Sequence, residues 1–568
     1  MPVTPPRRVP NARRRFWVLD ATEGQRREIT ARLRIQTPHL ALWVEEGVWH
    51  DIRQLEQAAE AFDGSLYAEM RSAFGSEWRP GIDGSPRINI LHATGLGEHV
   101  LGYTSSLDEY PSEIYPLSNE AEMITVNLDL VDPGSLSYQA LLAREFLGLI
   151  QWHQDRNEER WVQEGLAELA ASWTGSQIDA VWRAYLQEVD TPLAPWTDSE
   201  RQRGAAYLFL AYFHQRFGDE GTHTLTTEPA NGLRGFEATL DDLEAGLSLE
   251  DLLSDWLAAV YLDSVEGADG ARYTFRSLDL PRPTASAVYD LYPVHTDTSV
   301  HQLGADYVVL RGETDLSVRF TGQSYTRLLP GMPSVDGSVW WSNRSDESLM
   351  TLTRSFDLRQ VEQATLSYRL WYDIEAHYDY ATVEVSDDDG EHWQLLRLPS
   401  GTDASPYGYN PGWGYTGTSE GWLWEEIDLS DYAGDDILVR FSYLTDGAVT
   451  GEGLLLDDVS IAEIANKEGD AAQTDAWEAQ GFVRTDGLVP QRYLVLLITT
   501  GEEIKVERLS VDEDQSAEWV VPLADPDVQE GVLAVSALAP LTHQPAAYQL
   551  AITVAQTTSI EPPDATGD

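Results

Sequence analysis

The sequence lacks cysteine and is nearly without lysine. None of its 568 residues is cysteine, and Lys467 and Lys505 are its two lysines, so almost all positive charge comes from arginine. Without cysteine the chain can form no disulfide bond, no thiol nucleophile and no cysteine-ligated zinc site. This absence does not decide the cellular compartment, because a protein can be exported without disulfides.

Positive charge and long apolar runs are also scarce. The chain has 38 basic and 94 acidic residues, a net charge of −56, and such a surface repels nucleic acid and anionic membranes. It suits divalent cations or basic partners, although solubility or salt adaptation explains it as well. No run of about 18 apolar residues is present, so no transmembrane segment is expected. Residues 1–14 are basic, but no apolar core follows them, so they are not a signal peptide.

The chain is long enough for several domains of about 100–200 residues each. Its first half mixes strands with segments of helical spacing, which predicts an α+β domain. After about residue 280, short alternating strands separated by Gly, Asp, Ser and Asn predict β-sandwiches. The expected divisions are a disordered N-terminus at 1–14, an α+β domain at 15–280, a β linker at 281–330, a β-sandwich at 331–465, a C-terminal all-β domain at 475–556 and a disordered tail at 557–568.

Residues 141–173 match the pattern of a zincin active site except at its two histidine positions. Their sequence is LLAREFLGLIQWHQDRNEERWVQEGLAELAASW. Zincins carry His-Glu-x-x-His on a helix, with both histidines on one zinc ion and the glutamate as general base. Here Arg144 and Gly148 stand at the histidine positions, and Glu145 stands at that of the general base. We predict helices at 136–154 and 160–174 around this site.

The following helix carries the remaining acids of the pattern. Glu164, in WVQEGLAE, matches the third zinc ligand of the Glu-ligated branch, and Glu168 lies one turn further on, as a supporting acid behind the ligands. A substitute for the lost pair would have to come from another histidine, and His92 and His99 are the ones that could approach. His153 lies about 140° around the helix from Gly148, while His92 and His99 fall on or just after a predicted strand.

Several ordered segments resemble the immune inhibitor A-like family of bacterial secreted metallopeptidases. They are PGIDGSPRINILHA, GYTSSLDEYPSEIYPLSNEAEMITVNLD, the run from LLAREF to GLAELAASW, YDIEAHYDYATVEVSDDDGEHW and GEGLLLDDVSIAE. The resemblance covers residues 15–465. It implies a zincin (gluzincin) domain, then a MAM-like β-sandwich of jelly-roll type, export to the extracellular space or cell surface, and protein substrates. The family's activity requires the two histidines that this chain lacks.

Zinc is therefore not expected at this site. A single carboxylate is a poor zinc ligand set, since zinc takes about three protein ligands. Losing the metal would leave Glu145, Glu164 and Glu168 facing one another, and buried uncompensated carboxylates are costly. We predict that the guanidinium of Arg144 replaces the lost charge and bonds Glu164 or Glu168. The alternative is a solvent-exposed arginine in a decayed site.

The β-sandwich offers a second candidate site, for calcium. Its acidic residues favour oxygen-loving calcium, but solvated turn acids explain them equally. The candidate ligands are Asp373, Glu375, Asp379, Asp457 and Asp458. The aromatic stretch at 407–417 suggests stacking on sugars or a partner, or cover for the core.

Three functions remain open. The first is an inactive pseudopeptidase that binds a protein or peptide, the second an adhesion or carbohydrate-binding protein acting through its β-domains, and the third an active zinc endopeptidase with a rearranged site. Metal analysis with a casein digestion assay separates the third from the others. Nucleic acid is not an expected partner.

Overall fold

The computed structural model describes residues 11–555, except 23, 176–178, 194–195, 198, 269, 271, 336, 346–347, 447–448, 465–475 and 540. The tail expected at 557–568 lies outside these residues, as does most of the N-terminus expected at 1–14. The first strand already begins at Arg13, so the last part of that N-terminus is ordered. No helix in the described part of the chain is long and apolar enough to cross a membrane.

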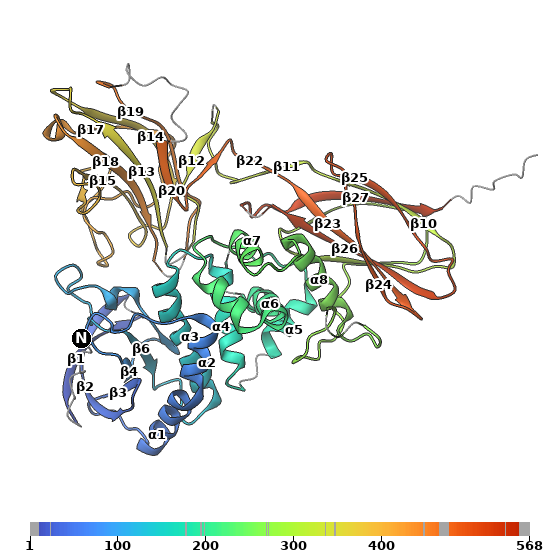
Figure 1. Ribbon diagram of the computed structural model, residues 1–568, viewed down its shortest axis with the longest axis horizontal. Coiled ribbons are helices and arrows are strands. Elements are labelled where there is room, and N and C mark those ends of the chain that lie inside the picture. The colour runs from blue at the N-terminus through green and yellow to red at the C-terminus, as the bar shows by residue number, and fades with distance from the viewer. Residues whose placement is uncertain are drawn as a thin grey trace, which may run out of the picture. The chain divides into compact units, whose positions relative to one another are not determined.

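The chain forms two compact units (Figure 1). One contains residues 1–180, 206–246 and 331–487, and the other contains residues 181–205, 247–330 and 488–568. Both units are therefore discontinuous in sequence.

The first unit begins with a mixed six-stranded sheet. Its strand order is β1-β2-β3-β4-β6-β5, with β3, β4 and β6 parallel and β5 antiparallel at one edge. Every residue of β4 and β6 is buried, as continuous apolar runs in central strands require. The strands are β1 (Arg13–Asp20), β2 (Gln25–Gln36), β3 (Leu40–Glu45), β4 (Ile88–Ala93), β5 (Gly102–Tyr103) and β6 (Met123–Asn127).

Helices lie between the strands of this sheet and after it in sequence, as the helical spacing in the first half predicted. Residues 52–74 form α1 and α2, joined by one π-helical turn, and the two helices predicted around the motif are present as α3 and α4. The helices are α1 (Ile52–Ala61), η1 (Phe62–Leu66), α2 (Tyr67–Phe74), η2 (Ser106–Glu109), α3 (Leu136–Gln154), α4 (Arg160–Ser172), α5 (Asp179–Gln187), α6 (Glu200–Thr227), α7 (Leu233–Asp242) and α8 (Leu249–Leu262).

A β-sandwich of two five-stranded sheets completes the first unit. Its core consists of the inward-facing residues of both sheets, for example Leu370 and Phe441. One sheet is β17 (Leu423–Asp428), β14 (Thr365–Asp373), β19 (Gly453–Ile461), β12 (Val339–Trp341) and β21 (Val483–Thr485). The other is β16 (Gln394–Leu395), β15 (Tyr380–Ser386), β18 (Asp436–Leu444), β13 (Leu349–Asp357) and β20 (Trp477–Gln480), with η3 (Ser430–Tyr432) before β18.

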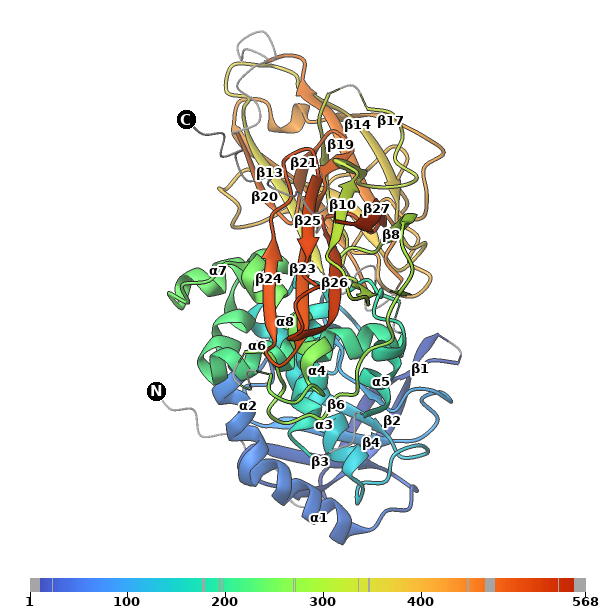
Figure 2. The ribbon, with the colours of Figure 1, turned by 90° about the vertical axis from the view of Figure 1, so that its right-hand side faces the viewer.

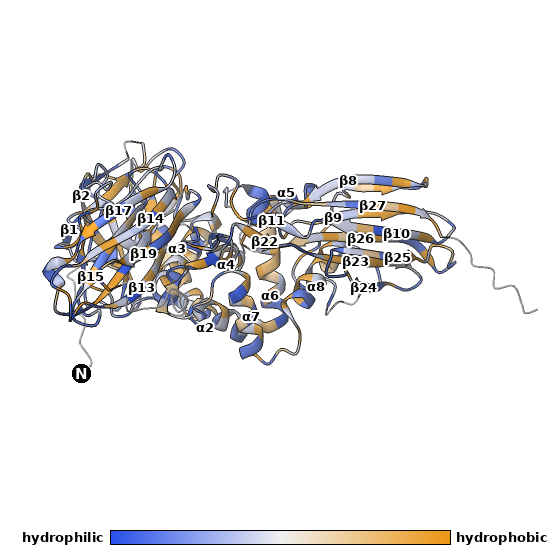
Figure 3. Cartoon of the chain, turned by 90° about the horizontal axis from the view of Figure 1, so that it is seen from above, coloured by the Kyte–Doolittle hydropathy of each residue, from blue (hydrophilic) through white to orange (hydrophobic). Residues whose placement is uncertain are grey.

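A second β-sandwich belongs to the other unit. Along its strands hydrophobic and hydrophilic residues alternate (Figure 3), because one face of each strand lines the core. Figure 2 shows its strands β24, β23 and β26 side by side. One sheet is β25 (Ser516–Val521), β10 (Leu316–Gly322), β27 (Ala546–Val554) and β8 (Val294–Val300). The other is β24 (Lys505–Leu509), β23 (Arg492–Gly501), β26 (Val528–Leu538), β9 (Asp306–Leu310) and β7 (Ala287–Tyr289).

Three expected domain boundaries differ from this arrangement. The segment at 281–330 is not a linker, because β8 and β10 pair with β27 and β9 pairs with β26. The first sandwich does not end at 465, because β20 and β21 complete its two sheets. The first domain is not continuous to 280, because α8 packs on β23 and the Tyr307 hydroxyl donates to the Leu257 carbonyl at 2.7 Å. In each case the partner strand is distant in sequence, so local pattern could not reveal it.

Candidate functional site

Helices α3 and α4 pack against each other and carry the motif residues. The α3 helix begins at the N-cap Ser135, whose hydroxyl accepts the Tyr138 amide, and its next residues are good helix formers. In α4 the residues from Trp161 to Ala171 are all buried, so both acidic side chains of this helix are held inside the fold. The two helices therefore fix the positions of the motif side chains.

Arg144 lies between the two glutamates of α4. Its Nη2 is 2.6 Å from Oε2 of Glu164, and its Nη1 is 2.5 Å from Oε1 of Glu168. The two glutamates face Arg144 together because residues four apart share one face of a helix. Arg160 adds a second cation, with Nη2 2.8 Å from the other oxygen of Glu164. The predicted contact of Arg144 with Glu164 or Glu168 is thus present with both.

These contacts set the charge state of Arg144. Burial by itself lowers the pKa of the guanidinium, but the carboxylates of Glu164 and Glu168 outweigh burial and raise the pKa above that of free arginine. Glu145, the predicted general base, is partly exposed and adds to the negative field at Arg144. Arg144 is therefore a permanent cation in this site.

The second lost histidine position is restricted by a neighbouring hydroxyl. A Cβ atom at Gly148 would lie 3.0 Å from Oγ1 of Thr104, which follows the edge strand β5. That separation is shorter than ordinary van der Waals contact, so a larger side chain requires Thr104 to move. Sequence reasoning did not identify Thr104, because no local pattern links it to the motif.

The other histidines do not form a ligand set here. His92 is fully buried, with Nδ1 2.9 Å from the Trp43 carbonyl and Nε2 2.8 Å from the Tyr138 hydroxyl. Burial lowers the pKa of His92 to about 4, so it is neutral. His153 and His99 are exposed.

The resemblance implies zinc at this site, and the donor set does not fit zinc. A guanidinium has no lone pair to offer a metal, and Gly148 has no side chain. The third-ligand position, Glu164, is engaged by Arg144 and Arg160. Among the described residues, the sets of three close metal-type donors lie in the first sandwich, away from these helices.

In that sandwich the structure gathers part of the predicted calcium set. Glu375 and Asp379 lie with Asp446, their ligand oxygens within 4.8 Å of one another. Asp379 is buried, accepting the Asp446 amide and the Tyr443 hydroxyl at 3.0 Å each. Burial raises the pKa of Asp379 to about 8. The sequence did not point to Asp446 as a ligand, because an Asp-Gly pair is typical of a turn.

The remaining predicted calcium ligands do not join this group. Asp457 and Asp458 form ion pairs with Arg369, at 2.5 and 3.4 Å. Asp373, at the end of β14, is not among the gathered acids. Cross-strand register explains the ion pairs, since Asp457 lies directly opposite Arg369. Calcium at the Glu375 group stays a prediction.

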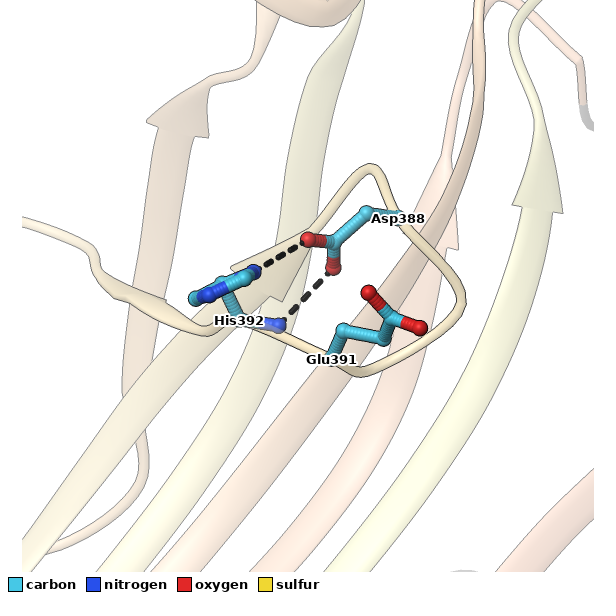
Figure 4. Close-up of side chains that lie close together, drawn as sticks. All are labelled: Asp388, Glu391 and His392. Carbon is cyan, nitrogen blue, oxygen red and sulfur yellow. Dashed lines mark hydrogen bonds and ion pairs between the residues drawn. The ribbon is translucent and has the colours of Figure 1, made fainter.

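A second acidic group lies on the turn after β15 (Figure 4). The Asp388 carboxylate accepts the His392 backbone amide at 2.9 Å and faces the His392 ring at 2.6 Å, while no dashed line reaches Glu391. Hydrogen bonds from His392 and Ser386 lower the pKa of Asp388 to about 2. These bonds are the local contacts that stabilise a tight turn.

The aromatic stretch at 407–417 packs largely against its own sandwich. Tyr407 stacks on Tyr378 with ring centroids 4.7 Å apart, and Tyr409 lies 5.5 Å from the same ring. Tyr415 is buried and bonds the Tyr368 hydroxyl at 2.6 Å. Tyr415 and Trp413 therefore contribute to the core, whereas Tyr407 is 40% exposed, so stacking on a sugar or a partner stays a prediction for that residue.

Comparison with known proteins agrees with this architecture. Residues 324–487 match the family described as immune inhibitor A-like, MAM domain, and the match ends after β20 and β21, where the sandwich ends. The first sandwich is a MAM domain of that type. The protein is thus multidomain and contains a helical region, a MAM domain and a further β-sandwich.

Among the individual relatives, one is a metalloprotease by name. The pre-pro-metalloprotease PrtV of Vibrio cholerae serotype O1 is 31% identical over 170 residues, 29% of this chain and 18% of that protein. Immune inhibitor A of Bacillus thuringiensis subsp. alesti is 27% identical over 164 residues, 28% of this chain and 23% of that protein. Bacillopeptidase F of Bacillus subtilis is 29% identical over 98 residues, 17% of this chain and 6% of that protein.

Each match spans less than a quarter of the relative's own length. Together with the MAM match, these relatives confirm the resemblance read from the sequence. The family match itself covers residues 324–487, the first sandwich.

Proposed function

We propose that this chain is a metallopeptidase-like protein without peptidase activity, which uses a zincin-type domain to bind a protein or peptide outside the cell. The observation that supports this most directly is the pair of ion pairs from Arg144 to Glu164 and Glu168. The guanidinium of Arg144 is a cation of the chain itself, and it lies among the side chains that surround the metal ion in a metallopeptidase of this type.

The loss of chemistry follows from the residues present. Peptide hydrolysis by a zincin needs an acidified water and a polarised carbonyl, and both depend on the metal. Arg144 can hold two carboxylates, but its pKa is too high for it to act as an acid or base near neutral pH. Glu145 alone could accept a proton from water, and general-base catalysis by itself contributes only about 10²–10⁴-fold.

A binding role remains because the framework is intact. Helices α3 and α4 keep their buried faces, and the site acids are paired so that they cost little to bury. The immune inhibitor A-like resemblance supports protein ligands and export. The two β-sandwiches add surface on which a partner can bind.

Metal content and proteolysis together test this proposal. The full chain, purified in zinc-containing buffer, should hold well under one zinc per chain by elemental mass spectrometry. Its digestion of casein should not respond to a chelator. An active metallopeptidase of the same family, treated identically, is the control. Stoichiometric zinc that disappears in a Glu164→Gln variant, with chelator-sensitive digestion, would contradict the proposal.

A further inference from the structure

A group of buried acids lies away from the motif, beneath the 110–121 loop (residues 110–121). Glu122 is 3% exposed and Glu109 is 8% exposed. Both carboxylate oxygens of Glu122 and one of Glu109 are sealed from solvent and accept no hydrogen bond. An ionised carboxylate in that state loses its hydration without compensation, which costs several kcal/mol or more. The fold therefore needs some way to neutralise Glu122.

No cation serves this purpose in the described residues. Glu122 faces the acids Glu109, Glu77 and Asp83. A Cβ atom at Gly81 would lie 2.5 Å from Cγ of Glu122, so the chain itself closes that side. Glu109 and Glu122 also do not form a metal site with their neighbours. In the described residues, the groups of three ligand atoms close enough to hold one ion do not include either residue. A proton is the neutralising charge that remains.

The surroundings decide which acid carries the proton. Glu109 lies within hydrogen-bonding reach of Glu122, which two carboxylates can use only when one is protonated. Glu109 also faces Arg156 and the Trp152 side chain, both of which favour its charged form, with Asp108 opposing them. Glu122 has only acids around it. Glu122 is therefore the donor and Glu109 the acceptor.

We propose that Glu122 and Glu109 share one proton, and that this proton holds the 110–121 loop closed, so that the loop opens as the pH rises. Glu109 ends η2 just before the loop, and Glu122 directly precedes β6 at its far end. The bond between them thus joins the two ends of the loop, next to the hydrogen bond from the Ala121 amide to the Asp108 carbonyl at 2.8 Å. When Glu122 loses its proton to solvent, two charged carboxylates face each other and separate.

The direction of the pH effect follows from linkage. Burial first, then the neighbouring acids, raise the pKa of Glu122, and burial raises the pKa of Glu109. In the open loop both acids return to the ordinary value of about 4.3. Above that value the closed form binds more protons than the open form, so closure weakens as the pH rises. Where the closed form holds one extra proton, the open fraction grows about tenfold per pH unit.

Limited proteolysis of the full chain tests the proposal. Chymotrypsin can cut the loop at Tyr110 or Tyr115, and Glu122→Gln keeps a hydrogen-bond donor toward Glu109 without titrating. The rate of loop cleavage in the wild type, divided by that in Glu122→Gln at the same pH, should rise with pH above neutrality, by up to about tenfold per pH unit. The exposed Glu113→Gln variant should behave as the wild type.

Three results would overturn the proposal. One is a ratio that does not change with pH. Another is calcium chloride that slows cleavage of the wild type but not of Glu122→Gln, since a cation would then be the neutralising charge. If Glu122→Gln does not fold, infrared spectroscopy of the Asp379→Asn variant decides, because the buried carboxyl of Asp379 would otherwise contribute to the same band. The carbonyl band of a protonated buried carboxyl should be present near pH 8 and lost at higher pH, and its absence would be the third contrary result.

Discussion

Replacing Arg144 with alanine removes the cation on which the site depends. Side-chain exposure is 21% for Arg144, 10% for Glu164 and 7% for Glu168, so both ion pairs are largely buried. Removing one partner of a buried pair typically costs about 3–5 kcal/mol. Because Glu164 keeps Arg160 at 2.8 Å, the expected loss lies near the lower end, at about 3 kcal/mol of unfolding free energy for the first unit.

The loss should also depend on pH, with a sign set by the glutamates. Without Arg144, the buried carboxylate of Glu168 would lose its cation, and burial disfavours the charged form of a carboxylate. This cost applies at pH values where the carboxylate is ionised and disappears where it is protonated. The difference between wild type and Arg144→Ala should therefore be largest near neutral pH and shrink as the pH falls toward about 4.

Urea denaturation of the full chain, followed by tryptophan fluorescence, measures both effects. Arg53→Ala is the matched control, because Arg53 is 83% exposed and its ion pair with Asp51 spans 3.7 Å. That control should lose less than about 1 kcal/mol. Glu168→Gln in the Arg144→Ala background should recover part of the stability. A contrary result is an Arg144→Ala variant that lowers the free energy of unfolding no more than Arg53→Ala does, and by the same amount at every pH. That result would refute the hypothesis that the guanidinium of Arg144 replaces the charge of the metal.

Three further predictions concern other positions. The double variant Arg144→His, Gly148→His should bind zinc, measured by calorimetry, more tightly when Thr104→Ala is added, because Oγ1 of Thr104 is 3.0 Å from the new Cβ position; equal affinity would show that Thr104 moves freely. Gly165→Ala should destabilise the first unit by about 1–3 kcal/mol, since its Cβ would lie 2.8 Å from Leu210 in α6; an unchanged urea midpoint would contradict this. Asp379→Asn should gain melting temperature relative to the wild type as the pH rises from about 4 to 8, because burial raises the pKa of Asp379 to about 8; a gap that does not vary with pH would contradict it.

Local periodicity sufficed for the elements around the motif. The helices predicted at 136–154 and 160–174 are α3 (Leu136–Gln154) and α4 (Arg160–Ser172). The contact of Arg144 with both glutamates was also predictable, because helix geometry fixes which side chains share a face and a buried carboxylate demands a partner.

Long-range pairing was not predictable in the same way. The strands at 294–322 pair with strands beyond residue 490, and nothing in a short alternating strand specifies so distant a neighbour. The acid pair beneath the 110–121 loop was missed for a related reason. Glu109 and Glu122 are ordinary acids in an acidic sequence, and only the tertiary fold buries them.

The insertion of the MAM domain into the second sandwich has a consequence for synthesis on the ribosome. The chain leaves the second sandwich after β11 (Tyr325–Arg327) and returns at β22 (Leu488–Pro490), which pairs with it. The MAM domain is complete when β21 ends at Thr485, whereas β8 and β10 wait for β27. β10 ends at Gly322 and β27 ends at Val554, 232 residues later. At about 5–20 residues per second that wait is roughly 12–46 seconds. Throughout it the early strands present unpaired edges to the ribosome's surroundings, so a nascent-chain chaperone has its longest opportunity there.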